Sequence, residues 1–123
     1  MLARLFLALS AALWLLYGAY CLLVPGSLVE AAGVVATTAT ATTELRAMYG
    51  GLQIAIGVLA LLGCLRGSLT RTALIALATL AAGLGSARLF GLWLDGGYAS
   101  YTGIALGFEW FTAIASFSLL RRR

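Results

Sequence analysis

Three ionisable side chains lie within otherwise apolar stretches of the sequence, and they are the candidates for a binding or catalytic role. Arg46, Arg88 and Glu109 are each surrounded by apolar and small residues. Charges inside a membrane span are costly, so they usually face the interior of a helix bundle and mark a functional site. A guanidinium can form two parallel hydrogen bonds with a carboxylate. Arg88 and Glu109 are therefore predicted to form an ion pair.

Each of these charges belongs to a row of small or polar residues at helical spacing. The rows are Arg46, Gly50, Gln53, Gly57 and Ala60; Ala78, Ala81, Gly85 and Arg88; and Thr102, Ala105, Glu109, Thr112 and Ser116. A shorter row, Ser10, Trp14 and Tyr17, lies in the first apolar stretch. This spacing places each row on one face of a helix. Small residues let helices approach, and hydroxyls and amides bond across the interface, so the rows are predicted to converge on one axis.

The converging rows predict a polar cavity that opens to the outer face of a membrane. Counted at about 1.5 Å per residue from the outer helix ends, the charges lie roughly 5 to 13 Å deep. The predicted ligand-binding residues are Arg46, Tyr49, Gln53, Arg88, Glu109 and Tyr17. An alternative interpretation is that the ion pair only holds the helices in register. No catalytic residue is assigned, and a chain without His is expected to hold neither a metal nor a cofactor.

The elements that must position these residues are membrane-spanning helices. The chain is 63% hydrophobic and only 10% charged, whereas a soluble domain usually has about 25% charged residues. We expect an all-α fold, a membrane-embedded four-helix up-down bundle in a single domain, 1–123. The predicted spans are 3–24, 43–65, 70–94 and 100–120. The first of them is expected to be a retained helix rather than a cleaved signal peptide, because its apolar run is too long for a signal core.

Local signals suggest how the first connection is organised. Pro25 should end the first helix, because proline lacks an amide and disfavours helix before it. Ser27 and Glu30 have the spacing of a capping box, which predicts a short interfacial helix. Thr42 or Thr43 is the predicted cap of the second span.

The arginines predict the orientation of the chain. Arg4 precedes the first span, Arg66 and Arg71 flank the turn between the second and third, and three arginines follow the fourth. The other two connections carry acids and no basic residue. Because basic residues concentrate in cytoplasmic loops, both termini are predicted to be cytoplasmic. Cys21 and Cys64 then lie at opposite faces of the membrane and cannot form a disulfide.

The segment Glu44-Leu45-Arg46-Ala47-Met48-Tyr49-Gly50-Gly51 resembles the start of the second helix in a family of small, uncharacterised bacterial membrane proteins. Arg88, the Asp95-Gly96 turn and Glu109 are similar to later features of that family. The resemblance implies a four-helix fold in the bacterial inner membrane, distantly DoxX-like, with the polar residues forming a shared site. It implies no chemistry, and the sequence shows no redox motif of its own.

Three classes of function remain open. The favoured class is a binding or accessory membrane protein that takes a small amphipathic or lipid-like ligand. The alternatives are a small membrane enzyme acting on a lipid with Glu109 as acid and base, and a small proton-coupled transporter. The expected partners are the lipid bilayer, the amphipathic ligand, and a second copy or another membrane protein. Nucleic acid is not expected, because the arginines sit at helix ends and form no basic stripe.

Overall fold

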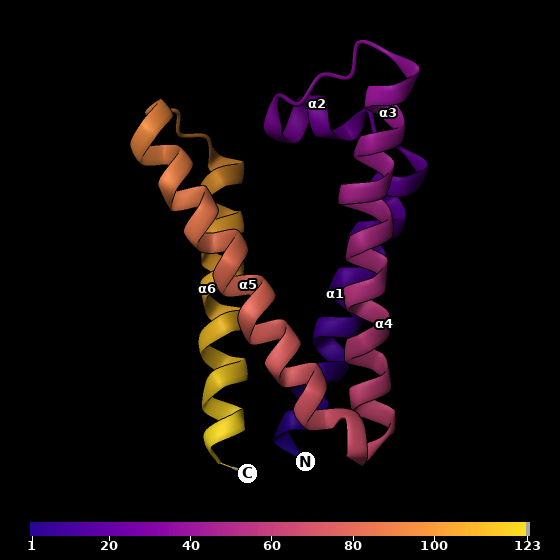
Figure 1. Ribbon diagram of the computed structural model, residues 1–123, viewed down its shortest axis with the longest axis vertical. Coiled ribbons are helices and arrows are strands. Elements are labelled where there is room, and N and C mark those ends of the chain that lie inside the picture. Colours follow the sequence, from indigo (N-terminus) through magenta and orange to yellow (C-terminus); the bar gives the residue numbers. More distant parts are fainter. Residues whose placement is uncertain (123) are drawn as a thin grey trace. The chain divides into compact units, whose positions relative to one another are not determined.

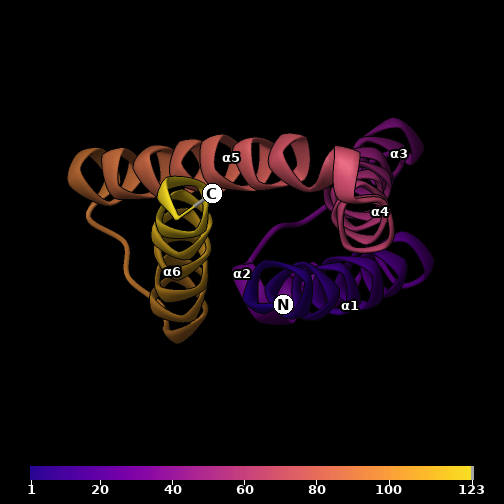
Figure 2. The same ribbon diagram turned by 90° about the horizontal axis from the view of Figure 1, so that it is seen from below.

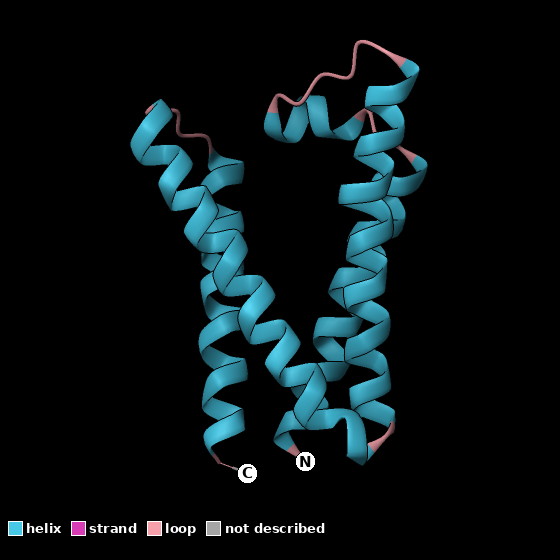
Figure 3. Ribbon diagram, in the orientation of Figure 1, coloured by secondary structure: helices cyan, strands magenta, loops and turns pink. Residues whose placement is uncertain are grey.

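The chain is built from helices throughout the part that the structure describes. A computed structural model describes residues 1–122, and it is 87% helical with no strand in that range (Figure 3). Within these residues, four helices are long and apolar enough to cross a membrane: Leu2–Leu23, Ala39–Leu65, Gly67–Asp95 and Ser100–Arg121. The all-α prediction is confirmed, and the protein is a multi-pass membrane protein.

The helices form two compact units, Met1–Thr70 and Arg71–Arg123. The first contains α1 (Leu2–Leu23), α2 (Ser27–Ala32), α3 (Ala39–Leu45), the π-helical turn η1 (Arg46–Gly51) and α4 (Leu52–Leu65). The second contains most of α5 (Gly67–Asp95) and all of α6 (Ser100–Arg121). Each unit is described by itself below. The single-domain organisation stays a prediction.

In the first unit, α1 and the segment from η1 to α4 pack side by side and run antiparallel (Figures 1 and 2). Glycines define the register. A Cβ added to Gly50 would lie 2.7 Å from Cβ of Leu22, and one added to Gly57 would lie 2.9 Å from the backbone nitrogen of Leu15. A Cβ on Gly18 would lie 2.8 Å from the backbone nitrogen of Ile54. Only glycine allows backbones to approach this closely, as is common between membrane helices.

The residue that caps the start of the second span is not the one that the sequence predicted. The second span begins at Ala39, four residues before the predicted Thr43, and its N-cap is Thr38, whose side chain accepts a hydrogen bond from the amide of Ala41. Thr42 and Thr43 instead donate their hydroxyls to the carbonyls of Thr38 and Ala39. The predicted threonine caps are therefore wrong, because the Ala-Thr run before them also forms helix.

The short helix α2 exists as predicted, and Figure 1 shows it lying across the end of α1. The predicted capping box does not form. Ser27 is the first helical residue, and its hydroxyl donates to the carbonyl of Val24 at 2.8 Å rather than accepting from a later amide. Leu28 is 1% exposed and anchors this helix. Gly33, with φ of 68°, ends it in the left-handed conformation that favours glycine.

A tight turn joins α4 to α5. Arg66 alone separates the two helices, since α5 begins at Gly67, before the predicted Thr70. Thr70 is fully buried, and its hydroxyl donates to the carbonyl of Gly63 at 2.8 Å. This hydrogen bond satisfies a carbonyl in the last turn of α4, where no intrahelical donor is left.

In the second unit, α5 and α6 are joined by the turn 96–99, which follows Asp95 as predicted. Gly96 has φ of 68°, a conformation that side chains rarely adopt. The polar row of α6 is turned inward: Glu109, Thr112 and Ser116 are 4%, 2% and 0% exposed, whereas neighbouring Phe111 is 66% exposed. The predicted row is therefore buried from Glu109 to Ser116, whereas its first two members, Thr102 and Ala105, are half-buried.

Candidate functional site

Arg88 of α5 and Glu109 of α6 form the predicted ion pair. Nε of Arg88 donates to both carboxylate oxygens of Glu109, at 3.2 and 3.1 Å, and Nη2 donates to Oε1 at 2.8 Å. The Glu109 side chain is 5% exposed and that of Arg88 is 28% exposed. The guanidinium thus holds the carboxylate at both oxygens, and the Arg88 side chain is more exposed than that of Glu109.

The position of this pair along the helices agrees with a site inside the membrane. Arg88 stands seven residues before the end of α5, and Glu109 nine residues after the start of α6. At about 1.5 Å per residue these separations correspond to roughly 10 and 13 Å along the helix axes. The two residues lie at similar depth because the helices are joined by a short turn. That agreement in depth is what allows the bidentate contact.

Two aromatic side chains that were not among the predicted site residues lie on the helix that carries Glu109. The guanidinium carbon of Arg88 lies 5.7 Å from the centre of the Tyr101 ring, within the range of cation–π attraction. The side chain of Trp110 packs on α5, because its Nε1 would lie 2.8 Å from a Cβ on Gly85. That nitrogen is buried without a hydrogen-bond partner among the described residues. The neighbouring Phe111 is exposed.

In the first unit, Arg46 was predicted to bind a ligand, and the structure shows that it also forms hydrogen bonds with the end of α1. Its Nη1 donates to the carbonyls of Leu22 and Leu23, the last residues of α1. These carbonyls lack intrahelical donors because α1 ends there. Pro25 has no amide to offer, and the Val24 carbonyl is taken by Ser27. The positive guanidinium at this helix end also complements the negative end of the helix dipole.

Arg46 begins the π-helical turn η1, which ends at Gly51. A π turn adds a residue to the helix and is frequent at functional sites. Gly50, at its end, is buried against the backbone of Leu22. One turn of helix therefore brings both the Arg46 side chain and a glycine contact to the end of α1. The sequence row identified Arg46 and Gly50 as one face, but gave no sign of the π turn.

The remaining predicted site residues also lie in the first unit. Tyr17 is 36% exposed and hydrogen bonded to the side chain of Cys21. Gln53 lies beside Gly18, and its Oε1 is buried without a hydrogen-bond partner among residues 1–122. Tyr49 is half-buried. The convergence of these residues with Arg88 and Glu109 stays a prediction.

Among the described residues, no group of three or more His, Cys, Asp or Glu side chains is placed to hold a metal ion. Cys21 and Cys64 are both free and lie near opposite ends of the first unit, in agreement with the sequence prediction. In the second unit the candidate site consists of the Arg88–Glu109 ion pair and the Tyr101 ring beside Arg88. In the first unit it consists of Arg46 and the two carbonyls at the end of α1.

Comparison with known proteins shows the family of the chain. Residues 2–120 match the family model described as a domain of unknown function, DUF4345. No curated protein and no solved structure matches the chain. Because the matching region covers nearly all of the sequence, and so both the α1–α4 contact and the Arg88–Glu109 pair, the protein belongs to the DUF4345 family, whose function is unknown.

Proposed function

We propose that the protein is a binding or accessory protein of the bacterial inner membrane that holds a small amphipathic ligand through a polar site in its outer half. The observation that carries this proposal is the unequal exposure of the ion pair. Glu109 is 5% exposed and Arg88 is 28% exposed. Charges inside a membrane span are costly and usually mark a functional site. The partial exposure of the Arg88 side chain leaves part of its surface open to a ligand.

The ligand is an amphipathic molecule with an anionic or strongly polar head. Arg88 attracts such a head, and a planar guanidinium binds carboxylate or phosphate oxygens well. The ring of Tyr101 beside Arg88 offers an apolar and aromatic surface to the part of the ligand nearest the head. Arg46, Tyr49, Gln53 and Tyr17 complete the proposed set of binding residues. The unpartnered Oε1 of Gln53 supports its place in that set, since a buried carbonyl oxygen gains from a donor.

The geometry of Glu109 favours binding over acid–base chemistry or proton-coupled transport. A carboxylate that shuttles protons must present an oxygen to its partner. Here both oxygens of Glu109 accept hydrogen bonds from Arg88.

The orientation belongs to the same proposal: both termini and the turn around Arg66 are cytoplasmic, and the Asp95 turn faces outward. The arginine distribution supports it. Single cysteines at Ser68 and Gly97, each in a Cys21→Ala, Cys64→Ala background, test it with a membrane-impermeant thiol reagent on intact cells. Labelling at position 97 but not at 68 is expected. The reverse pattern would contradict the orientation.

The family resemblance enters the proposal through segment 44–51. We propose that this Glu-Leu-Arg-Ala-Met-Tyr-Gly-Gly stretch recurs in related chains because Arg46 and Gly50 both contact the end of α1. The distant likeness to DoxX-like proteins is also part of this proposal, and we infer no activity from it.

Native mass spectrometry of the full chain, purified in mild detergent, tests the binding function. A bound amphipathic molecule of defined mass is expected in wild type. The double variant R88E/E109R restores the ion pair with its charges exchanged, so it should remain folded but lose an anionic ligand at least about tenfold. Leu89→Ala, beside Arg88 and on the exposed surface, is the matched control. A wild-type protein free of bound molecules, or equal binding by R88E/E109R, would overturn the proposal.

A further inference from the structure

The arginines at the helix ends form a surface that neither the ion pair nor the proposed ligand site uses. Among residues 1–122, five exposed arginines lie at or beside helix ends, namely Arg4, Arg66, Arg71, Arg121 and Arg122. In the first unit, Arg4 is in the first turn of α1 and Arg66 directly follows α4. Since these two helices run antiparallel, both arginines belong to the same end of the unit.

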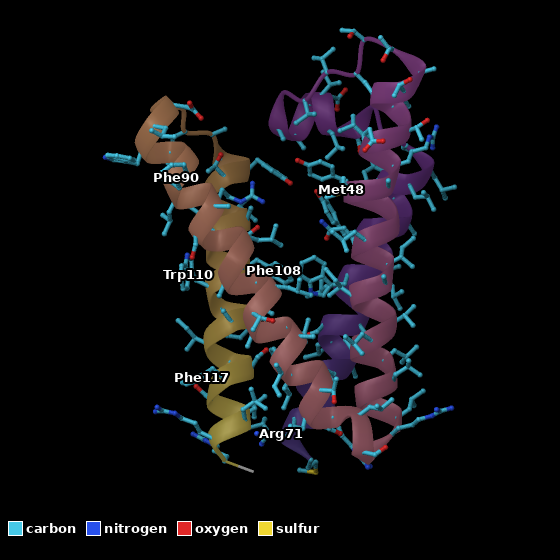
Figure 4. All side chains as sticks on the ribbon, in the orientation of Figure 1. Met48, Arg71, Phe90, Phe108, Trp110 and Phe117 are labelled. Atoms are coloured by element: carbon cyan, nitrogen blue, oxygen red, sulfur yellow. The ribbon has the colours of Figure 1, made fainter. Side chains whose placement is uncertain are left out.

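The second unit repeats this arrangement. Arg71 lies near the start of α5, where Figure 4 labels it, and Arg121 is the last residue of α6. Because α5 and α6 are joined by the turn 96–99, the start of one and the end of the other belong to the same end of this unit. Each unit, taken by itself, therefore has an arginine end.

No acidic side chain neutralises these arginines. The chain has four acids in all. Glu30 and Glu44 lie at the opposite end of the first unit and Asp95 at the opposite end of the second, while Glu109 is paired with Arg88. Among residues 1–122, no acidic side chain therefore lies at the arginine ends to offset their positive charge.

Two contacts show how these arginines are placed at the helix ends. Nη2 of Arg4 lies 3.4 Å from where a Cβ on Gly67 would stand, so two arginines gather around the turn that Arg66 begins. The guanidinium carbon of Arg121 lies 4.8 Å from the centre of the Phe117 ring. Phe117, labelled in Figure 4, is 53% exposed and lies one turn before the end of the membrane-spanning helix α6. An arginine with an apolar ring beneath it at a helix end is the arrangement expected at a membrane interface.

From this we infer that the arginine ends bind the headgroups of anionic phospholipids in the leaflet they face. A guanidinium forms paired hydrogen bonds with phosphate oxygens, and an anionic lipid supplies a net negative charge that a zwitterionic lipid lacks. The helix-end position selects lipid over a soluble anion, because the arginines stand at headgroup level when the helices span the bilayer. This inference is independent of the ligand site at Arg88.

Competition between two lipids in mixed micelles tests the inference, and micelles remove any effect of inverted topology. The full chain is incubated with equal amounts of phosphatidylglycerol and phosphatidylcholine of the same acyl chains, and retained lipid is counted by native mass spectrometry. Wild type should retain phosphatidylglycerol about fivefold over phosphatidylcholine, in line with the attraction of anionic lipid for a few arginines. Added salt at about 0.5 M should reduce this preference, because it screens exposed charges.

Paired variants locate the effect. R4Q/R66Q and R71Q/R121Q should each lower the preference for phosphatidylglycerol by about half or more, and the corresponding Lys variants should keep most of it. Glu44→Gln with Asp95→Asn is the control, since it changes charge at the opposite ends only and should leave the ratio unchanged. If a Gln pair does not fold, the inference is tested by the wild-type protein alone, whose preference for phosphatidylglycerol should fall when salt is added. Equal retention of both lipids by wild type, or a preference that the folded Gln pairs keep, would overturn the inference.

Discussion

Nε and Nη2 of Arg88 together contact both carboxylate oxygens of Glu109, 21 positions further along the chain, at distances of 2.8 to 3.2 Å. This contact joins α5 to α6 within the membrane-spanning part of the chain. It therefore fixes the register of the two helices as well as the charge of the candidate site. The Arg88–Glu109 pair can both hold the two helices together and bind a ligand. Substitutions separate the two roles, because one affects the free energy of unfolding and the other affects ligand binding.

Replacing Arg88 by alanine should strongly destabilise the protein. Glu109 would be left as a buried carboxylate without its partner, which typically costs about 3–5 kcal/mol of unfolding free energy. Leu89→Ala, at a side chain that is 47% exposed, should change it by less than about 1 kcal/mol. Unfolding in detergent, followed by circular dichroism, measures both. Equal destabilisation by the two substitutions would show that the ion pair does not hold α5 and α6 together.

Arg46 is predicted to stabilise the end of α1. Arg46→Ala removes donors from the carbonyls of Leu22 and Leu23, and hydrogen bonds from a charged donor are worth about 1.5–3 kcal/mol. Hydrogen exchange should become faster in the last turn of α1, including the amide of Val24. Glu44→Gln, at a nearby exposed side chain, is the control and should leave exchange there unchanged. Unaltered exchange in Arg46→Ala would mean that α1 ends stably without this arginine.

Gly50 and Gly51 are adjacent in sequence but differ in the space around them. A Cβ on Gly50 would lie 2.7 Å from Cβ and 2.8 Å from Cα of Leu22, so the backbones must separate, at a cost of about 1–3 kcal/mol. A Cβ on Gly51 would meet only the carbonyl oxygen of Arg46, at 3.9 Å. Gly51→Ala should therefore be neutral or stabilise the helix by up to about 1 kcal/mol. Thermal unfolding of the two variants compares them directly, and the opposite order would rule out the close α1–α4 contact.

Much of the fold follows from the sequence because the membrane imposes simple rules. Long apolar stretches must form helices, so the spans were predictable to within a few residues. Polar residues must avoid lipid, so the buried row through Glu109 and the Arg88–Glu109 pair were predictable too. In both cases one dominant free-energy term decides the outcome.

The details that escaped prediction depend on contacts between segments. Thr38, Thr42 and Thr43 are equivalent as potential caps, and the choice among them depends on how far the helix extends. The use of Arg46 at the end of α1 depends on the register of two helices, which the glycine contacts set. The packing of Trp110 on Gly85 likewise requires the neighbouring helix. A sequence pattern gives the face of a helix but not the atom that it meets.

The contact between Gly85 and Trp110 gives the sharpest test of how α5 and α6 pack. A Cβ on Gly85 would lie 2.8 Å from Nε1 of Trp110 and 3.1 Å from Cε2, so Gly85→Ala forces the indole to move and should cost about 1–3 kcal/mol. Gly83→Ala is the matched control, because nothing lies within 4 Å of its Cβ position. Trp110→Phe shortens the ring system, so the double variant G85A/W110F should recover part of the loss. A thermodynamic cycle of the single and double variants should give a coupling of about 0.5–3 kcal/mol, as for residues in contact. Strict additivity would show that the indole does not pack on Gly85, and the α5–α6 register that positions Arg88 against Glu109 would then need revision.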